Sequence, residues 1–130
     1  MSELIYDGLP VDEAIAMLKS LAEPKRLRIF AELMQGDSCN CELGDKLGLP
    51  PNLLSHHLRS LSEAGLVTSR RDSIDGRWIY YSVDREAAAR WQAWFRSFLD
   101  PHRIQDRIVC GPEGQQLLDE TSFVRLDTIS

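Results

Sequence analysis

The stretch between Cys39 and Leu66 constrains the fold most, because its pattern is that of two helices joined by a tight turn. A short first helix leads to a turn at residues 48–50. Pro51 then suits the first position of the second helix, where its fixed φ and missing N–H cost nothing. Gly65 stands where a left-handed C-terminal cap is expected. The segment therefore predicts a helix-turn-helix, with an ordinary amphipathic helical hairpin as the alternative.

The second helix of this segment separates an apolar face from a polar one. At about 100° per residue, three leucines share one side, and hydrogen-bonding side chains occupy the other. In a helix-turn-helix protein, the second helix offers such groups to base edges in the major groove. His57 lies nearer the apolar side and is predicted to be structural. The residues predicted to contact DNA from this helix are Asn52, Ser55, His56 and Arg59.

Two strand-like runs follow the second helix, at residues 66–71 and 77–83. Between them, the pair Asp75-Gly76 is a strong turn signal. A two-stranded ribbon directly after a recognition helix is a wing, and a plain structural hairpin would not need arginines on both arms near its tip. Residues 25–83 are therefore predicted to form a winged helix-turn-helix. The arginines predicted to grip phosphate or the minor groove are Arg70, Arg71 and Arg77.

Composition and charge indicate one soluble domain. Of the 130 residues, 43% are apolar and 27% are charged, which is ordinary for a globular protein. No apolar run approaches the roughly 18 residues of a membrane helix, and no leader is recognisable, so a cytoplasmic protein without membrane contact is predicted. The net charge of −5 is uneven: residues 51–83 carry four basic and three acidic residues, whereas residues 1–50 carry five and nine. The segment assigned to DNA is thus the non-negative one.

Two flanking helices, at residues 11–23 and 84–99, are predicted to form a dimer face together. The later helix carries more aromatic residues than a small core needs, and apolar patches of that size usually mark an interface. The alternative is that these rings complete the core of the monomer. The residues assigned to the interface are Ile15, Leu18, Trp91, Trp94, Phe95 and Phe98. Residues 1–99 thus form the DNA-binding and dimerisation domain, with its core at 11–99, and residues 100–130 form its C-terminal tail.

Three cysteines form no disulfide framework, and a reducing compartment would keep them as thiols. Cys39 and Cys41 lie at the start of the first helix of the helix-turn-helix. Asn40 is a favourable N-cap, so Cys39 is expected outside the helix and Cys41 just inside it. The helix dipole favours thiolates at this end, and soft thiolates suit As(III), Sb(III), Cd(II) or Pb(II). Both sulfurs can reach one ion only if the first turn is extended, because side chains two residues apart on a helix point about 200° apart.

The chain resembles the ArsR–SmtB repressors, a family of arsenic- and metal-sensing transcription regulators. The resemblance runs from about residue 11 to residue 99 and is carried by LAEPKRLRIFAEL at 21–33, SCNCELGDKLGLPPNLLSHHLRSLSEAGLV at 38–67 and DGRWIYYSV at 75–83. It implies a mainly α fold with a small β-hairpin wing. It also implies a homodimer that binds double-stranded operator DNA and represses its own operon until an inducer binds, with no enzymatic activity.

The resemblance also bears on the cysteines. Arsenic-sensing members have Cys-x-Cys-x-x-Cys at this position, and here Gly44 replaces the third cysteine. As(III) favours three sulfurs, so Cys110 is the candidate for the third ligand, from the same or the partner subunit. The expected function is therefore an arsenite-responsive repressor that binds As(III) or Sb(III) through Cys39, Cys41 and Cys110.

Three alternatives use the same cysteines differently. The protein could be a repressor of this family that senses Cd(II) or Pb(II), or a regulator whose cysteines sense oxidants. A thiol-active enzyme is disfavoured, because Cys-x-Cys is not the Cys-x-x-Cys redox motif.

A zinc site of the family, Asp-x-His…His-x-x-Glu/His, is matched only in its first half, at residues 100–102, and is not expected.

Overall fold

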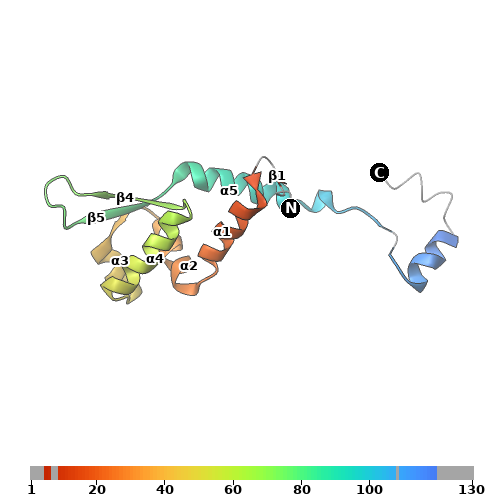
Figure 1. The fold of residues 1–130 in the computed structure, drawn as a ribbon, viewed down its shortest axis with the longest axis horizontal. Coiled ribbons are helices and arrows are strands. Elements are labelled where there is room, and N and C mark those ends of the chain that lie inside the picture. Colours follow the sequence, from red (N-terminus) through yellow and green to blue (C-terminus); the bar gives the residue numbers. More distant parts are fainter. Residues whose placement is uncertain (1–4, 7–8, 108, 120–130) are drawn as a thin grey trace. The chain divides into compact units, whose positions relative to one another are not determined.

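The computed structural model describes residues 5–6, 9–107 and 109–119, which fall into two compact units, Met1–Phe95 and Arg96–Ser130. The first unit holds the helices and sheet of the predicted winged helix-turn-helix (Figure 1). Its elements, in chain order, are β1 (Ile5–Tyr6), β2 (Leu9–Pro10), α1 (Val11–Leu21), α2 (Pro24–Leu33), β3 (Ser38–Cys39), α3 (Asn40–Leu47), α4 (Pro51–Glu63), β4 (Val67–Arg71), β5 (Ile79–Val83) and α5 (Arg85–Phe98), whose last turn belongs to the second unit.

Proline and glycine set the helix ends of the DNA-binding segment. Pro24 and Pro51 occupy the first turns of α2 and α4, where no intrahelical N–H is lost. The turn between α3 and α4 begins at Gly48, whose φ of 67° lies in the left-handed region that favours glycine. Gly65, at φ 76°, closes α4 in the same way. The predicted helix-turn-helix is therefore confirmed.

A three-stranded antiparallel sheet forms the wing and its root, in the order β3-β5-β4. The predicted hairpin is present, with Val67 opposite Val83 at its base and Arg71 opposite Ile79 near its tip. The sequence did not predict the third strand, β3. It places Cys39 opposite Tyr80 of β5. The segment that carries the cysteine pair is thus joined to the wing by backbone pairing.

The core lies where the helices of the first unit meet, and α5 closes it with two tryptophans. Trp91 is 7% exposed and Trp94 is 4% exposed, and their rings meet edge to face with centroids 5.9 Å apart. This corrects their assignment to the dimer face: as in the alternative left open by the sequence, these two rings complete the core of the monomer. Phe95 is half-buried against the same core, its ring centroid 5.0 Å from that of Trp94.

The second unit begins in the last turn of α5 and continues with a short 3-10 helix, η1 (Pro101–Arg103). Asp100 caps η1 by accepting from the backbone N–H of His102 at 3.0 Å. Residues 112–119 are helical.

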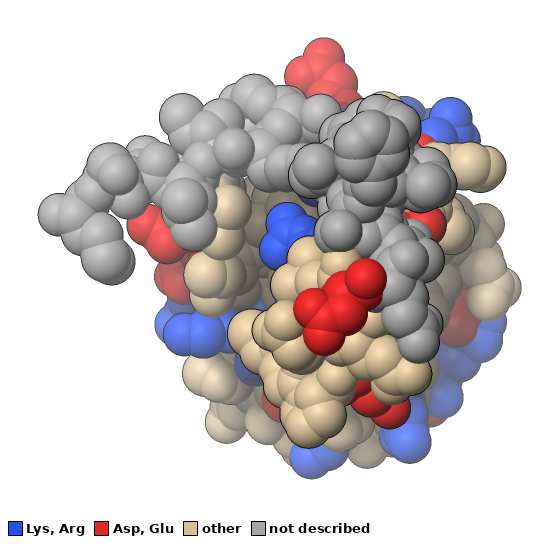
Figure 2. Space-filling model, turned by 90° about the vertical axis from the view of Figure 1, so that its right-hand side faces the viewer, with Lys and Arg blue, Asp and Glu red and all other residues tan. Residues whose placement is uncertain are grey.

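No helix among the described residues is long and apolar enough to cross a membrane. Both acidic and basic side chains occur on the face drawn in Figure 2, so neither sign of charge covers it alone.

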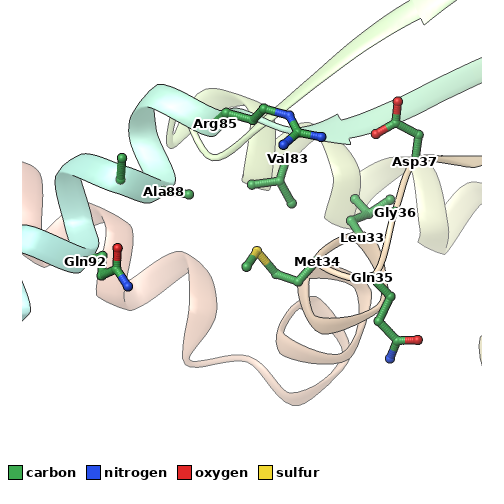
Figure 3. Close-up of a pocket in the computed structure, with 10 residues that line it drawn as sticks. Leu33, Met34, Gln35, Gly36, Asp37, Val83, Arg85, Ala88 and Gln92 are labelled. Carbon is green, nitrogen blue, oxygen red and sulfur yellow. The ribbon is translucent and has the colours of Figure 1, made fainter.

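A cavity of about 540 Å³ opens in the first unit between the end of α2, the end of β5 and the start of α5 (Figure 3). Met34 and Val83 form part of its apolar wall, and Arg85 also lines it. Its ten lining residues include none of the cysteines and none of the predicted DNA contacts. The cavity therefore does not belong to the candidate site.

Candidate DNA-binding surface and cysteine site

The helix α4 presents its polar face outward, as the sequence predicts. Leu54, Leu58 and Leu61 are buried in the core on its other side, at 3%, 2% and 0% exposure. Because these leucines hold one side of the helix on its neighbours, the opposite side is open to a ligand. The four side chains predicted to contact DNA, Asn52, Ser55, His56 and Arg59, are all exposed.

His57 is buried beneath this surface, at 5% exposure, in agreement with a structural role. Its Nδ1 lies 3.4 Å from Nη1 of Arg26. A guanidinium only donates hydrogen bonds, so Nδ1 accepts and the ring proton sits on Nε2. That Nε2 is buried and has no hydrogen-bond partner within the described chain. Arg26 also donates from Nε to the carbonyl of Ser20 at 2.6 Å, which ties α4 to the junction between α1 and α2.

The buried position of His57 predicts a dependence of stability on pH. Burial lowers the pKa of His57 below its usual value of 6.5, and the Glu23 carboxylate, 3.8 Å from Nδ1, opposes the shift. The unfolded chain therefore takes up a proton near pH 6.5 that the folded chain still resists, so folding stability should fall as the pH drops below 6.5. Urea unfolding of His57→Gln should show a weaker loss than wild type over this range. His56→Gln, at the exposed neighbour, is the control: it removes only the smaller contribution of the His56 charge to the lowered pKa of His57, so its slope should stay closer to that of wild type than to that of His57→Gln.

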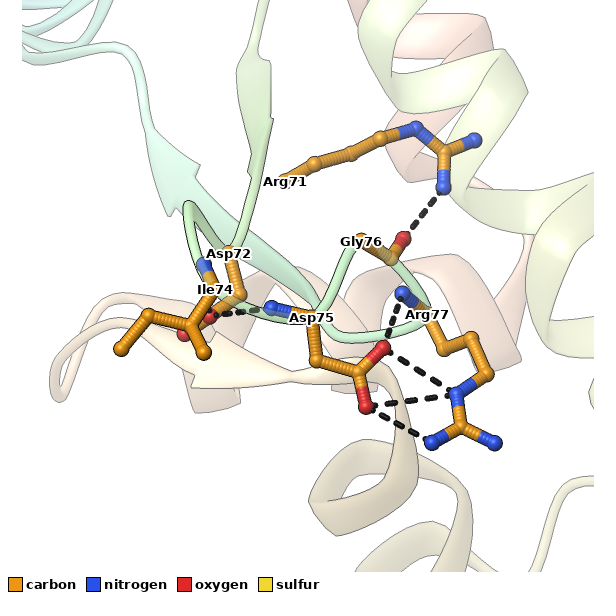
Figure 4. Close-up of polar contacts among 6 residues, drawn as sticks. All are labelled: Arg71, Asp72, Ile74, Asp75, Gly76 and Arg77. Carbon is orange, nitrogen blue, oxygen red and sulfur yellow. Dashed lines mark hydrogen bonds and ion pairs between the residues drawn. The ribbon is translucent and has the colours of Figure 1, made fainter.

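The tip of the wing is a rigid turn built around Asp72 (Figure 4). One carboxylate oxygen, Oδ1, accepts from the backbone N–H of Ile74 at 2.8 Å and from that of Asp75 at 3.0 Å. The other, Oδ2, accepts from the hydroxyl of Tyr80 at 2.7 Å. The Asp75 N–H and then the Tyr80 hydroxyl hold the pKa of Asp72 below its usual value. Arg70 stacks on Tyr80, with its guanidinium carbon 4.6 Å from the ring centroid.

The other two arginines of the wing have partners within the turn. Arg71 donates from Nη1 to the carbonyl of Gly76 at 2.6 Å. Arg77 forms an ion pair with Asp75, with Nη2 2.8 Å from Oδ2 (Figure 4). This contact raises the pKa of Arg77 and lowers that of Asp75. All three predicted arginines are thus exposed on one hairpin, but the charge of Arg77 is offset locally.

The residues that shape this tip were missed by the sequence analysis. Asp75 was used there only as part of a turn signal, and Asp72 and Tyr80 received no role, although an aspartate that opens a turn is a known signal, since its side chain can accept from the backbone N–H two residues on. The contact between Oδ2 of Asp72 and Tyr80 on the opposite strand is the one that local sequence could not predict.

Cys39 is the N-cap of α3, one residue before the predicted Asn40. Its backbone is extended, at φ −83° and ψ 162°, because it still belongs to β3, and its Sγ accepts from the backbone N–H of Glu42 at 3.4 Å. The residue is buried, at 7% exposure. Its thiol therefore already has a structural contact, at the point where the sheet passes into the helix.

Cys41 is exposed and lines a cavity of about 300 Å³ between α3 and α4. Ser55, one of the predicted DNA contacts, lines the same cavity, and Leu54 forms part of its apolar wall. The buried Oδ1 of Asn40, another lining residue, has no hydrogen-bond partner among the described residues. A group attached to Cys41 would thus lie beside the first turns of the recognition helix.

Cys110 is exposed in the second unit, whereas the cysteine pair belongs to the first. Within the described residues no three His, Cys, Asp or Glu side chains are grouped so as to hold a metal ion. A Cβ on Gly44 would lie 3.2 Å from the carbonyl oxygen of Leu49, so a cysteine at position 44 would require a small shift of that backbone. The part of Cys110 as a third ligand remains a prediction.

The predicted dimer face is reduced to its exposed members. Ile15 and Leu18, three residues apart on α1, are 43% and 45% exposed. Phe98, in the second unit, is 46% exposed. The side chains of Ile15 and Leu18 are available to a partner chain, unlike the two buried tryptophans.

Comparisons with known proteins agree with this geometry. Residues 23–69 match the model of the arsR family of bacterial regulatory proteins. An HTH-type transcriptional regulator of Methanocaldococcus jannaschii is 37% identical over 75 residues, which are 56% of this chain and 81% of that protein. The arsenical resistance operon repressor of Bacillus subtilis is 39% identical over 69 residues, 52% of this chain and 63% of the repressor.

One solved structure of similar fold is a homodimer. The homodimeric winged helix-turn-helix DNA-binding domain of a possible ArsR-family regulator from Mycobacterium bovis superposes with a TM-score of 0.56 at 30% identity, over 71% of this chain and 82% of that one. These relatives are named as regulators and repressors rather than enzymes. The matching family model, the shared identity and the winged helix together show that the chain belongs to the ArsR family of bacterial regulatory proteins.

Proposed function

We propose that the protein is a dimeric transcriptional repressor that binds operator DNA and releases it when As(III) or Sb(III) binds its cysteine thiolates. The proposed binding to DNA rests on the exposed polar face of α4. The same unit also holds a wing that bears arginines and whose tip is held by hydrogen bonds of Asp72. In this mode α4 enters the major groove, and the wing reaches phosphate or the minor groove. The homodimeric relative from Mycobacterium bovis supports a dimer on two half-sites.

The position of Cys39 supports the coupling between ion and DNA. Its thiol accepts one of the free N–H groups in the first turn of α3, that of Glu42, and its backbone pairs with Tyr80 at the root of the wing. An ion that takes a lone pair of this sulfur competes with the cap and disturbs both elements at once. Loss of an N-cap costs about 0.5–2 kcal/mol, a range that overlaps the roughly 1–3 kcal/mol of coupling that gives a 5- to 150-fold change in affinity.

The position of Cys41 supports a second effect. Since Cys41 and Ser55 line one cavity, an ion held by Cys41 lies next to a side chain proposed to contact DNA. The state with bound ion would therefore differ from the DNA-bound state both at the start of α3 and at the start of α4. An ion shifts the equilibrium between the DNA-bound and the ion-bound state only if it binds one of them more tightly. Both sulfurs lie at positions where these two states would differ.

The choice of ion follows from the number of sulfurs. Two thiols lie at the start of α3, and Cys110 is the one further cysteine of the chain. We propose that Cys110, from the same or the partner subunit, completes a three-sulfur site. Such a site suits As(III), whereas Cd(II) commonly takes four ligands. The test of arsenite has two alternative outcomes. Cadmium or lead could prove to be the inducer, or the response could come from a disulfide formed under oxidation.

Arg59 provides the test of the groove assignment. A duplex selected from random DNA by the purified full chain serves as the operator. Arg59→Ala should weaken its binding by about 1–3 kcal/mol and relax the preference at one base pair, as loss of a base contact does. Arg71→Ala is the matched comparison and should weaken all duplexes alike, with a shallower salt dependence, as loss of a phosphate contact does. Unchanged affinity in both variants would place DNA elsewhere on the protein.

A further inference from the structure

We propose that Ile74, at the tip of the wing, makes an apolar contact with the minor groove of the operator. The inference rests on the proposed function as a DNA-binding repressor and adds a contact that is neither a base hydrogen bond nor a phosphate contact. The side chain of Ile74 is 95% exposed, compared with 45% for Trp78 later in the same loop. A side chain with that exposure buries almost nothing against its own chain, so isoleucine at this position does not serve folding.

The residue type is also unusual for its position. The turn runs Asp72-Ser73-Ile74-Asp75-Gly76, and its other members are the residue types that turns favour. A β-branched apolar side chain adds nothing to such a turn. At the tip of the wing it is instead available for contact with another molecule.

The tip is ordered by hydrogen bonds within the turn. Asp72 accepts from the backbone N–H of Ile74 at 2.8 Å, and its second oxygen is held by Tyr80 of the opposite strand. Figure 4 shows Ile74 and Arg77 leaving the turn in different directions, so the isoleucine is not covered by the arginine. Because the turn is already ordered, docking it costs little further conformational entropy.

The charges around Ile74 favour DNA as the partner. Asp75 is paired with Arg77, whereas Asp72 keeps its negative charge and accepts from Tyr80 and from backbone N–H groups of the turn. Residues 70–77 together carry three basic and two acidic side chains. Arg70 and Arg71 stand exposed on β4, the arm that leads to the tip. Basic arms suit the phosphates on the rims of a groove, and an apolar tip suits the deoxyribose edges and base steps within the minor groove. Proteins that bind the minor groove use isoleucine in this way.

The experiment compares two exposed isoleucines in the full chain, using the duplex that the wild-type protein selects from random DNA. Ile74→Ser should weaken binding about tenfold, as expected for loss of a partly buried apolar contact. The slope of affinity against salt should not change, because no charge is removed. Ile104→Ser makes the same replacement at a position that is 81% exposed in the second unit, and should bind like wild type. Both variants should keep the wild-type unfolding temperature.

Three results would overturn the inference. Wild-type affinity in Ile74→Ser would show that the tip makes no such contact. A lower unfolding temperature in Ile74→Ser would assign the residue to folding. Normal affinity for the duplex with weakened repression in cells would assign it to a protein partner. If the wild-type chain selects no duplex at all, the proposed function fails, and this outcome is recognised before any Ile74 variant is measured.

Discussion

Leu18→Asp is expected to produce a monomer that loses most of its operator affinity. Leu18 is 45% exposed on α1, beside Ile15 at 43%, so a carboxylate there is solvated in the single chain but would be buried without a partner in a dimer. Two half-sites about one helical turn apart need two linked recognition helices. Unlinking them should reduce affinity by roughly 100-fold or more, since linkage is worth factors of that order. Sedimentation and duplex binding measure the two effects.

Leu27→Asp is the matched control for this change. Leu27 is an exposed leucine on α2, at 52%, outside the predicted interface. The control should remain dimeric and bind DNA normally. A Leu18→Asp protein that sediments as a dimer would move the interface away from α1. Trp94 is unsuitable for this test, because it is 4% exposed and its replacement by Asp would unfold the core.

Cys39→Ser should abolish the response to arsenite while leaving operator binding intact. The hydroxyl of serine is a good N-cap, so it can accept from the backbone N–H of Glu42 in place of the thiol and preserve the start of α3. What the variant loses is the soft ligand alone. Cys41→Ser should behave in the same way, and Cys110→Ser should raise the arsenite concentration needed for release. Fluorescence anisotropy of a labelled duplex, titrated with arsenite under strong reductant, gives all three results.

The same titration separates the alternatives. Release by arsenite from Cys39→Ser would remove Cys39 from the ligand set. Release of the wild-type complex by oxidant but not by arsenite would indicate a redox sensor, and release by cadmium alone would change the ion. X-ray absorption of the arsenite-loaded chain counts the sulfurs directly. Three sulfurs in both wild type and Cys110→Ser would exclude Cys110 as a ligand.

The DNA-binding segment could be predicted from the sequence because its signals are local. Pro51 and Gly65 mark the ends of α4, and the leucine spacing gives its buried side. The hairpin follows from two strand-like runs and a turn signal between them. Each of these features is decided by a few neighbouring residues, so one sequence is enough to predict it.

What could not be predicted depends on contacts between distant residues. The strand β3 is two residues long and exists only because it pairs with β5, some forty positions later. Without that pairing, Cys39 has no reason to be extended, and Asn40 is the better cap by residue type. The tryptophans of α5 posed the same difficulty: an aromatic helix face looks alike whether its own chain or a partner covers it. Neither local sequence signals nor contacts between distant residues predict where Cys110 lies relative to the cysteine pair.

The ion pair between Arg77 and Asp75 has a consequence for how such a protein would search a chromosome. Binding to random DNA is driven by the release of cations condensed on the phosphates, one for each free positive charge that replaces them. Arg77 carries its own counterion 2.8 Å away, so it displaces fewer of those cations than a free arginine would. In a chain of net charge −5, this reduces the time spent on the wrong sites. Few molecules would then be held idle along the genome, and a small number of copies could keep an operator occupied.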